Sequence, residues 1–136
     1  LSANAGQPHQ ALAKAASGGE LSRISLALQV CLTEKVTPPL LIFDEVDAGI
    51  GGETAHAVGQ LLRALGSHSQ LLCITHLAQV AAQAHHHYHV HKTTSNNHTF
   101  THIEPIDNED RTNEIARMLG GTNDSSQALA ATLLQC

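Results

Sequence analysis

The sequence has few of the features typical of membrane, secreted or DNA-binding proteins. Among its 136 residues, no apolar run approaches the roughly 20 residues that cross a bilayer, and no basic, apolar leader resembles a secretory signal. The net charge is −5 with histidine neutral, whereas free-standing DNA-binding domains are usually basic. The composition therefore gives no support for direct DNA contact by this segment, and we expect no membrane partner.

Cysteine is also scarce. Cys31, Cys73 and Cys136 are far apart and form no C-x-x-C pair, so neither a zinc knuckle nor a disulfide framework is indicated. Cys31 and Cys73 lie in apolar runs, and we expect both to be buried. This cysteine usage fits a reducing cytoplasm best.

What the sequence does contain is typical of a folded domain. Hydrophobic residues make up 42% of the chain and charged residues 14%, which fits a globular class. The length is enough for one domain with a core. The chain begins with Leu1 rather than Met, so we expect a fragment, with residues 1–136 forming a single partial domain.

Hydrophobic patterning predicts an alternation of helices and strands. A helix is expected from Glu20, then strands at 40–43 and 71–74, each followed by a helix, at 53–65 and 77–84. The two apolar runs suit strands buried on both faces, as in a parallel sheet. The inward residues expected of the first helix are Leu21, Ile24, Leu28, Cys31 and Leu32, and those of the second are Ala55, Val58, Leu61, Leu62 and Leu65.

The C-terminal part predicts a different arrangement. Residues 86–92 and 99–104 are predicted to be two strands of a hairpin around a polar turn at 93–97, and helices are expected at 108–119 and 125–134. The fold class expected is therefore α/β, with a mostly parallel sheet flanked by helices and a C-terminal hairpin with helices.

The first candidate site is Ser17-Gly18-Gly19-Glu20, directly before the first expected helix. Two glycines let the backbone approach a ligand closely, and a helix N-terminus directs free N–H groups and a positive dipole end at an anion. With the Ser17 hydroxyl, the set can grip a terminal phosphate. The alternative is an ordinary Ser/Gly helix cap.

Asp44 and Glu45 follow the first apolar strand. A carboxylate at the carboxyl edge of a buried parallel strand can hold Mg²⁺, usually through water, and a neighbouring carboxylate can orient or deprotonate an attacking water. His76 follows the second strand and could contact a γ-phosphate. The alternatives are ordinary acids at a strand end and a structural histidine.

The order and spacing of these motifs resemble an ABC-type ATPase. Ser17 to Glu20 resembles the signature, the strand ending in Asp44-Glu45 the Walker B strand, Asp47 the D-loop and His76 the switch histidine. The residues that surround these motifs narrow the resemblance to the RecN family of SMC-like DNA repair proteins. The segments that carry it are 16–24, 43–52, 75–81, 85–88 and 117–121.

The resemblance implies the C-terminal lobe of a split ABC head, with the Walker A loop and a coiled coil before Leu1. No G-x-x-x-x-G-K-[ST] motif occurs here, which agrees. It implies a homodimer that sandwiches ATP and Mg²⁺ and hydrolyses ATP, whereas the fragment alone is expected to be inactive. It also implies recombinational repair of double-strand breaks, DNA binding through the full-length protein, the recombinase RecA as a partner, and a cytoplasmic, nucleoid-associated location.

The roles implied by the resemblance are specific. Ser17, Gly18, Gly19 and Glu20 would close over the γ-phosphate held by the other head. Asp44 would hold magnesium, Glu45 would be the general base, and His76 would contact the γ-phosphate. Asp47 would couple the two nucleotide sites across the dimer.

Three alternatives remain open at this point. The chain could be half of an ABC head from a transporter or from another SMC-like protein, although the residues after Glu20 and the C-terminal hairpin argue against a transporter. It could also be a non-enzymatic interaction or metal-binding module. The last reading rests on His87, His89 and His91, which share one strand face at period two and could chelate zinc or copper with His85, His98 or His102. The plainer interpretation is a polar outer strand face.

Overall fold

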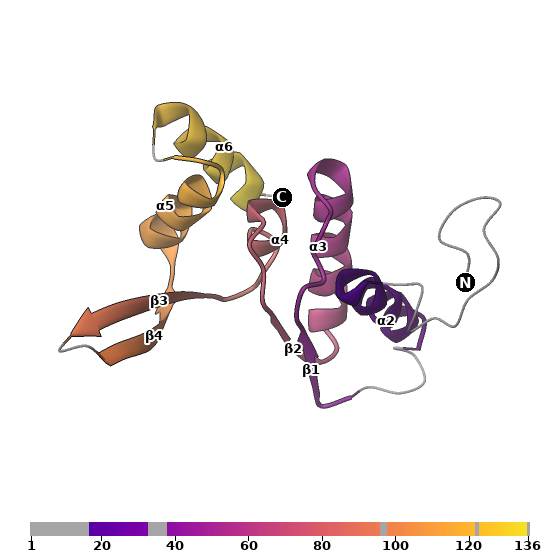
Figure 1. Cartoon of the computed structure of the whole chain (residues 1–136). Coiled ribbons are helices and arrows are strands. Elements are labelled where there is room, and N and C mark those ends of the chain that lie inside the picture. Colours follow the sequence, from indigo (N-terminus) through magenta and orange to yellow (C-terminus); the bar gives the residue numbers. More distant parts are fainter. Residues whose placement is uncertain (1–16, 33–37, 96–97, 122, 136) are drawn as a thin grey trace.

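The computed structural model describes residues 17–32, 38–95, 98–121 and 123–135. The expected helices and strands are confirmed, with ends shifted by a few residues (Figure 1). Residues 1–16, part of the expected turn at 93–97, and Cys136 lie outside the described residues. In chain order the elements are α2 (Gly18–Leu32), β1 (Leu40–Phe43), α3 (Gly52–Gly66), β2 (Gln70–Cys73), α4 (Ala78–Ala81), β3 (His87–Ser95), β4 (His98–Ile106), α5 (Asn108–Met118) and α6 (Asp124–Leu134).

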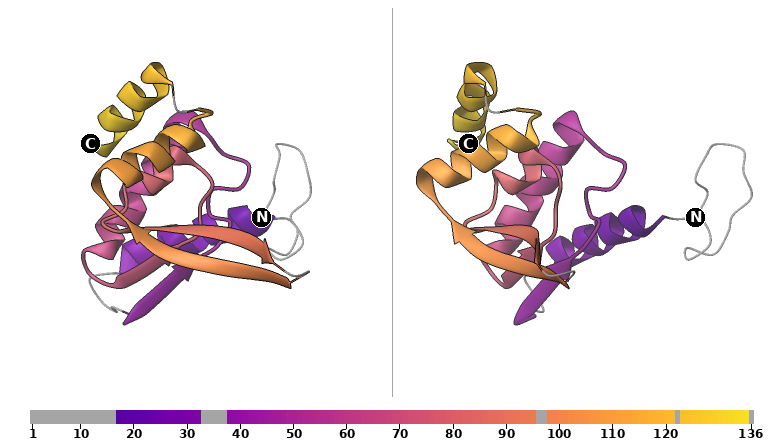
Figure 2. Two further views of the ribbon diagram at one scale, coloured as in Figure 1. Left: turned by 90° about the vertical axis from the view of Figure 1, so that its left-hand side faces the viewer. Right: turned by 60° about the vertical axis from the view of Figure 1, so that its left-hand side comes forward.

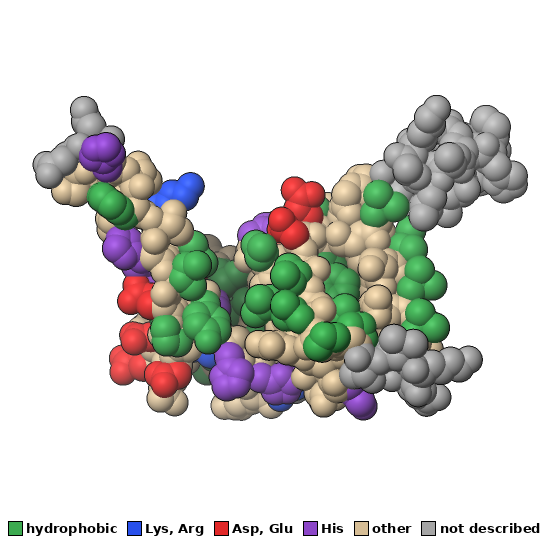
Figure 3. All heavy atoms as spheres, turned by 90° about the horizontal axis from the view of Figure 1, so that it is seen from below, with side chains coloured by type: hydrophobic (Ala, Val, Ile, Leu, Met, Phe, Trp, Pro, Cys, Tyr) green, Lys and Arg blue, Asp and Glu red, His purple; other side chains and the backbone are tan. Residues whose placement is uncertain are grey.

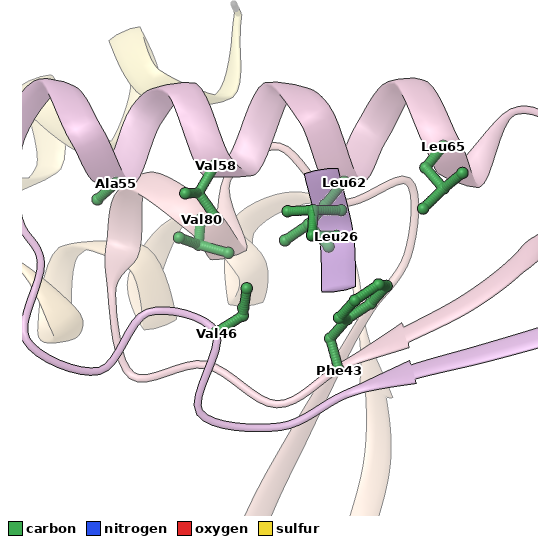
Figure 4. Packing of buried hydrophobic residues seen from close by; sticks show 8 residues of the cluster. All are labelled: Leu26, Phe43, Val46, Ala55, Val58, Leu62, Leu65 and Val80. Atoms are coloured by element: carbon green, nitrogen blue, oxygen red, sulfur yellow. The ribbon is translucent and has the colours of Figure 1, made fainter. Parts of the chain in front are cut away.

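The first part of the molecule is a parallel strand pair covered by two helices. β1 and β2 pair from Leu40↔Gln70 to Phe43↔Cys73, and a hydrogen bond of 2.9 Å from the Ile74 N–H to the Phe43 carbonyl extends the pairing. Helices α2 and α3 pack on the same side of these strands (Figure 4). The buried core there consists of Leu26, Phe43, Val46, Ala55, Val58, Leu62, Leu65 and Val80.

The expectation that both strands are buried on both faces is wrong for the described residues. Successive side chains of a strand point to opposite faces, and only one face is covered. Phe43 is buried, whereas Ile42 is 62% exposed and Leu72 is 47% exposed. Figure 3 shows the resulting apolar surface from below. We call Leu40, Ile42, Leu72 and Ile74 the open sheet face.

Helix α2 also turns a different face inward from the one expected. Its buried residues are Gly19 and Leu26, with Val30 packed against the same core. Leu28 is 58% exposed and Leu32 is exposed. The inner stripe is therefore displaced by about two positions from the expected one, because Gly19 allows close contact with the loop after β1. Cys31, expected inside, is exposed, and so is Leu61 of α3.

The second part is a hairpin with three helices at its base. β3 and β4 pair from His87↔Ile106 to Ser95↔His98, so the ladder runs further toward the turn than expected. Helices α4, α5 and α6 share a small core of mostly alanine around Ile115. Figure 2 shows these helices to one side and the hairpin reaching away from them. The described strands thus divide equally between parallel and antiparallel pairs, and the expected mostly parallel sheet is limited to β1 and β2.

Within the described residues, no helix combines the length and the apolar character that crossing a membrane requires.

Candidate functional site

The loop that follows β1 is fastened to helix α2 by side-chain hydrogen bonds. The Ser22 hydroxyl donates to the Asp44 carbonyl at 2.9 Å. The Arg23 guanidinium donates to the carbonyls of Val46 at 3.1 Å and Ala48 at 2.8 Å. Because these bonds satisfy backbone acceptors that no strand partner reaches, they hold the loop in one shape.

The N-terminus of α2 is closed by a reciprocal cap. The backbone N–H of Ser17 donates to Glu20 Oε2 at 2.7 Å, and the Ser17 hydroxyl donates to the same oxygen at 3.1 Å. In return, the Glu20 N–H donates to Ser17 Oγ at 3.4 Å. This is a capping box, and the bond from the Ser17 backbone N–H holds the pKa of the Glu20 carboxyl below its usual value. Ser17 remains exposed, so the cap does not hide it.

Gly18 and Gly19 lie where side chains would collide with the acidic loop. A β-carbon on Gly19 would come within 2.9 Å of the Glu45 carbonyl oxygen and of the Ala48 β-carbon. A β-carbon on Gly18 would come within 3.0 Å of Glu45 Oε2. The first N–H groups of a helix have no acceptor within the helix itself, and here the Glu20 N–H is satisfied by Ser17 Oγ.

Asp44 and Glu45 lie exposed at the carboxyl end of β1. Glu45 has φ +56°, a left-handed conformation that costs a non-glycine residue about 1–2 kcal/mol. The contacts of Ser22 and Arg23 on either side of Glu45 keep it there. Exposed carboxylate oxygens are donors that Mg²⁺ prefers, so the acids present fit the ion expected at Asp44.

Asp47 is directed inward and joins the two strand ends. It is 1% exposed, and its Oδ2 atom accepts hydrogen bonds from the Thr75 hydroxyl at 2.6 Å and the His76 N–H at 3.0 Å. Burial raises the pKa of the Asp47 carboxyl, but the bonds from Thr75 and His76 outweigh it and lower the pKa overall.

The His76 ring faces outward beside the same carboxylate. Its side chain is 70% exposed, and Nδ1 lies 3.2 Å from Asp47 Oδ2. The Thr75 hydroxyl also accepts from the Leu77 N–H at 3.1 Å, which ties the start of the next segment to the pair. His76 is therefore held at one ring nitrogen while much of the ring is open to solvent.

The fold thus brings several expected site residues together in two groups. Gly18, Gly19 and Glu45 are in close proximity, and Asp47 and His76 are in contact. Sequence reasoning gave no role to Ser22, Arg23 or Thr75. Ser22 and Arg23 lie about one turn before Leu26 and share its inner side of α2. Because the expected inward stripe did not include Leu26, no sequence signal indicated that these two polar residues have partners in the core.

The fold is that of an SMC ATPase head. A solved structure described as the structural biochemistry of ATP-driven dimerization and DNA-stimulated activation of SMC ATPases superimposes with a TM-score of 0.57. The match covers 88% of this chain and 71% of that chain at 19% sequence identity. At such low identity the likeness is evidence for the fold alone.

The sequence comparison gives the family. The sequence model of the RecF/RecN/SMC N terminal domain matches residues 9–99, and the chain belongs to this family. A DNA repair protein RecN from Vibrio cholerae is 54% identical over 130 residues, which are 96% of this chain and 24% of that protein. The RecN of Treponema pallidum is 52% identical over 96% of this chain and 23% of its own length.

Relatives of lower sequence identity are found as well. The RecN of Bacillus subtilis is 40% identical over 121 residues, which are 89% of this chain and 21% of that protein. The chain therefore spans about a quarter of the length of the curated relatives it matches. It is a RecN homologue with an SMC-type ATPase head fold.

Proposed function

We propose that this chain is the C-terminal half of an ABC-type ATPase head and that it completes a nucleotide site together with a Walker A loop from elsewhere. The supporting observation is the exposed surface on which the tip of α2 and the acids after β1 meet. Ser17, Asp44, Glu45 and His76 are all accessible there. A surface of this kind needs a second surface to enclose a triphosphate.

In the proposed mechanism the tip of α2 recognises phosphate. Ser17, Gly18 and Gly19 would close over the γ-phosphate of ATP held by a partner head, with backbone N–H groups and the helix dipole opposing its charge. Glu20 would act through the cap, because it fixes the Ser17 hydroxyl. This assigns Glu20 a positioning role instead of direct contact with the nucleotide.

The acids would act on the magnesium ion and on the attacking water at the nucleotide. Asp44 would hold magnesium, which when bound neutralises charge on the phosphates. Glu45 would accept a proton from the attacking water, and its exposed carboxylate leaves room for that water. The bonds from Ser22 and Arg23 would keep this base in position.

His76 would contact the γ-phosphate, and Asp47 would orient it. The Asp47 carboxylate lies beside Nδ1 and can accept an N–H from that nitrogen. Because phosphate oxygens are acceptors, Nε2 would have to carry a proton as well in order to donate to the ligand. Asp47 was expected to act across the dimer. Its near-complete burial favours an indirect route, in which it links the loop after β1 to the histidine.

We also propose that the chain works in recombinational repair of DNA double-strand breaks. The support is its similarity to several proteins named DNA repair protein RecN and its likeness to an SMC ATPase head. DNA binding, RecA as a partner, and a homodimer of ATP-sandwiched heads belong to the same proposal. The net charge of −5 places DNA contact in other parts of the protein.

The decisive experiment replaces the proposed base. In the full-length protein, Glu45→Gln should reduce ATP turnover by about 100-fold or more while ATP-dependent pairing of heads, followed by light scattering, is retained. Glu53→Gln is a matched control, because Glu53 is an exposed glutamate in the first turn of α3. It should leave turnover unchanged.

Two results would count against the proposal. Normal turnover in Glu45→Gln would remove Glu45 as the base. Tight binding of ATP to the 136-residue chain alone, measured by calorimetry at micromolar concentration, would contradict a site shared between two halves.

A further inference from the structure

We propose that the β3–β4 hairpin binds a divalent transition-metal ion of the zinc type through His89, His91 and Glu104. This inference is independent of the proposed ATPase site, because the hairpin shares no residue with it. It rests on strand register, distances and donor chemistry. Figure 1 shows the hairpin reaching out from the helices, and Figure 3 shows histidine side chains along it.

The register places the three donors on one face. Residues opposite each other in an antiparallel pair share a face, and His89 is opposite Glu104 while His91 is opposite His102. His89 and His91 are partly buried, whereas Tyr88 and Val90, at the alternate positions, are exposed. By this register one face of the hairpin carries five imidazoles, those of His87, His89, His91, His98 and His102, and the carboxylate of Glu104.

The distances are those of a nearly assembled metal site. One ligand atom from each of His89, His91 and Glu104 lies within 4.8 Å of the others. His91 Nδ1 and Glu104 Oε1 are 3.1 Å apart. With metal–ligand bonds of about 2.0–2.1 Å, ligands of a tetrahedral zinc ion are about 3.3–3.4 Å apart. His91 and Glu104 are within a few tenths of an ångström of this spacing, and the ligand atom of His89 is within 4.8 Å of both.

The cluster also contains a buried polar atom without a hydrogen-bond partner among the described residues. His91 Nδ1 is shielded from solvent and forms no hydrogen bond of acceptable geometry among the described residues, although Glu104 is at ion-pair distance. Buried polar atoms usually have a partner. The ring is stacked between His89 and His102, with centroids 5.3 and 5.0 Å away, so these rings are ordered against one another.

The donor set indicates which ion fits. Two imidazoles and one carboxylate are typical zinc ligands, and three protein ligands leave a fourth position for water. Mg²⁺ and Ca²⁺ prefer oxygen ligands throughout, so they should not compete. The Glu104 side chain is 57% exposed, which gives the ion access from solvent.

Neighbouring residues would support the ligands. Glu114 of α5 lies 3.9 Å from His89 Nε2 and is itself held by two bonds of 2.7 Å from Arg117. The Thr93 hydroxyl lies 2.8 Å from His102 Nε2, which fixes the third ring beside the cluster. A carboxylate near a ligating imidazole raises its basicity and fixes its orientation.

Calorimetric titration of the full chain with zinc chloride tests the proposal. We expect one strong site per chain, and at least tenfold weaker binding in His91→Ala and in Glu104→Gln. His98→Ala is the matched control, because His98 lies on the same hairpin opposite Ser95 and outside the cluster. It should bind zinc as the unmodified chain does.

Cobalt substitution provides a readout that does not depend on stability. Co²⁺ in a tetrahedral site should show intense visible absorption, and His91→Gln should abolish it while circular dichroism shows the fold retained. The proposal is overturned if His98→Ala weakens zinc binding as much as His91→Ala, because binding would then be spread over the histidines. A weak octahedral cobalt spectrum would overturn it as well.

Discussion

A single oxygen of Asp47 receives the Thr75 hydroxyl at 2.6 Å and thereby joins the end of β2 to the loop after β1. The same atom accepts the His76 N–H at 3.0 Å. Both bonds are nearly inaccessible to water, because Asp47 is 1% exposed. A shift of either strand end would therefore break a buried charge-assisted bond, and the two ends should move as one.

Removing this acceptor should destabilise the fold. Asp47→Ala removes the acceptor of two part-buried hydrogen bonds, from the Thr75 hydroxyl and the His76 N–H, which costs about 1–3 kcal/mol. Asp47→Asn should cost less, because its amide oxygen can replace Oδ2. Urea unfolding of the two variants checks the order. A double-mutant cycle with Thr75→Val should give a coupling of about 0.5–3 kcal/mol, and a coupling of zero would mean that the 2.6 Å bond is not important for stability.

The same carboxylate should make stability depend on pH. Its pKa is lowered in the folded state, so the stabilisation is fully present above the unfolded pKa of about 3.9. It is lost as the pH falls from there through the lower folded value. The difference in unfolding free energy between the natural chain and Asp47→Asn should therefore be constant above about pH 5 and shrink on acidification. A difference that grows in acid would have the wrong sign.

The two glycines at the tip of α2 should respond differently to alanine. Gly19→Ala drives a β-carbon into backbone and side-chain atoms at 2.9 Å, and such overpacking costs about 1–3 kcal/mol. Gly18→Ala meets only the flexible end of Glu45 at 3.0 Å, so it should be nearly neutral. The melting temperature of Gly19→Ala should therefore be lower than that of Gly18→Ala. Equal melting temperatures would show that the loop after β1 moves to admit the new β-carbon without loss of stability.

Thiol chemistry should distinguish the two described cysteines. Burial, with smaller contributions from the charges of Asp47 and Asp44, raises the pKa of the Cys73 thiol to about 12. The reactive thiolate is therefore almost absent at pH 8, whereas Cys31 is exposed. Iodoacetamide should label Cys31 about 100-fold faster or more, as judged by peptide mass spectrometry. Comparable rates would indicate that β2 opens readily.

Periodicity and turn residues were sufficient to predict the order of the elements, because these are local signals. The Pro38-Pro39 break, the apolar runs and the Gly120-Gly121 stop each act within a few residues. A helix cap at Ser17 was one of the two interpretations of that motif, and the structure shows it as a capping box with Glu20. The polar strand ends at Thr93 to Ser95 were missed because cross-strand pairing, not composition, keeps them extended.

Burial could not be predicted equally well, because it depends on which faces meet. An apolar run such as β1 does not indicate that α2 and α3 both pack on one side and leave Ile42 exposed. The phase of α2 was set by the contact of Gly19 with the loop after β1, and not by the leucines at 28 and 32. In the site, the residue types were enough to indicate the two acids and the histidine. The inward direction of Asp47 could not be predicted, because it depends on the Thr75 hydroxyl, which comes close only in the folded chain.

The open sheet face has a practical consequence for the chain in solution. Four large aliphatic side chains, Leu40, Ile42, Leu72 and Ile74, lie together in water, and contact between copies would remove them from it. Sulfate and similar salts strengthen such contacts, so solubility should fall as ammonium sulfate is added. Exchange of Ile42 and Ile74 for threonine should raise the salt concentration at which the chain precipitates, without disturbing the packed side of the sheet.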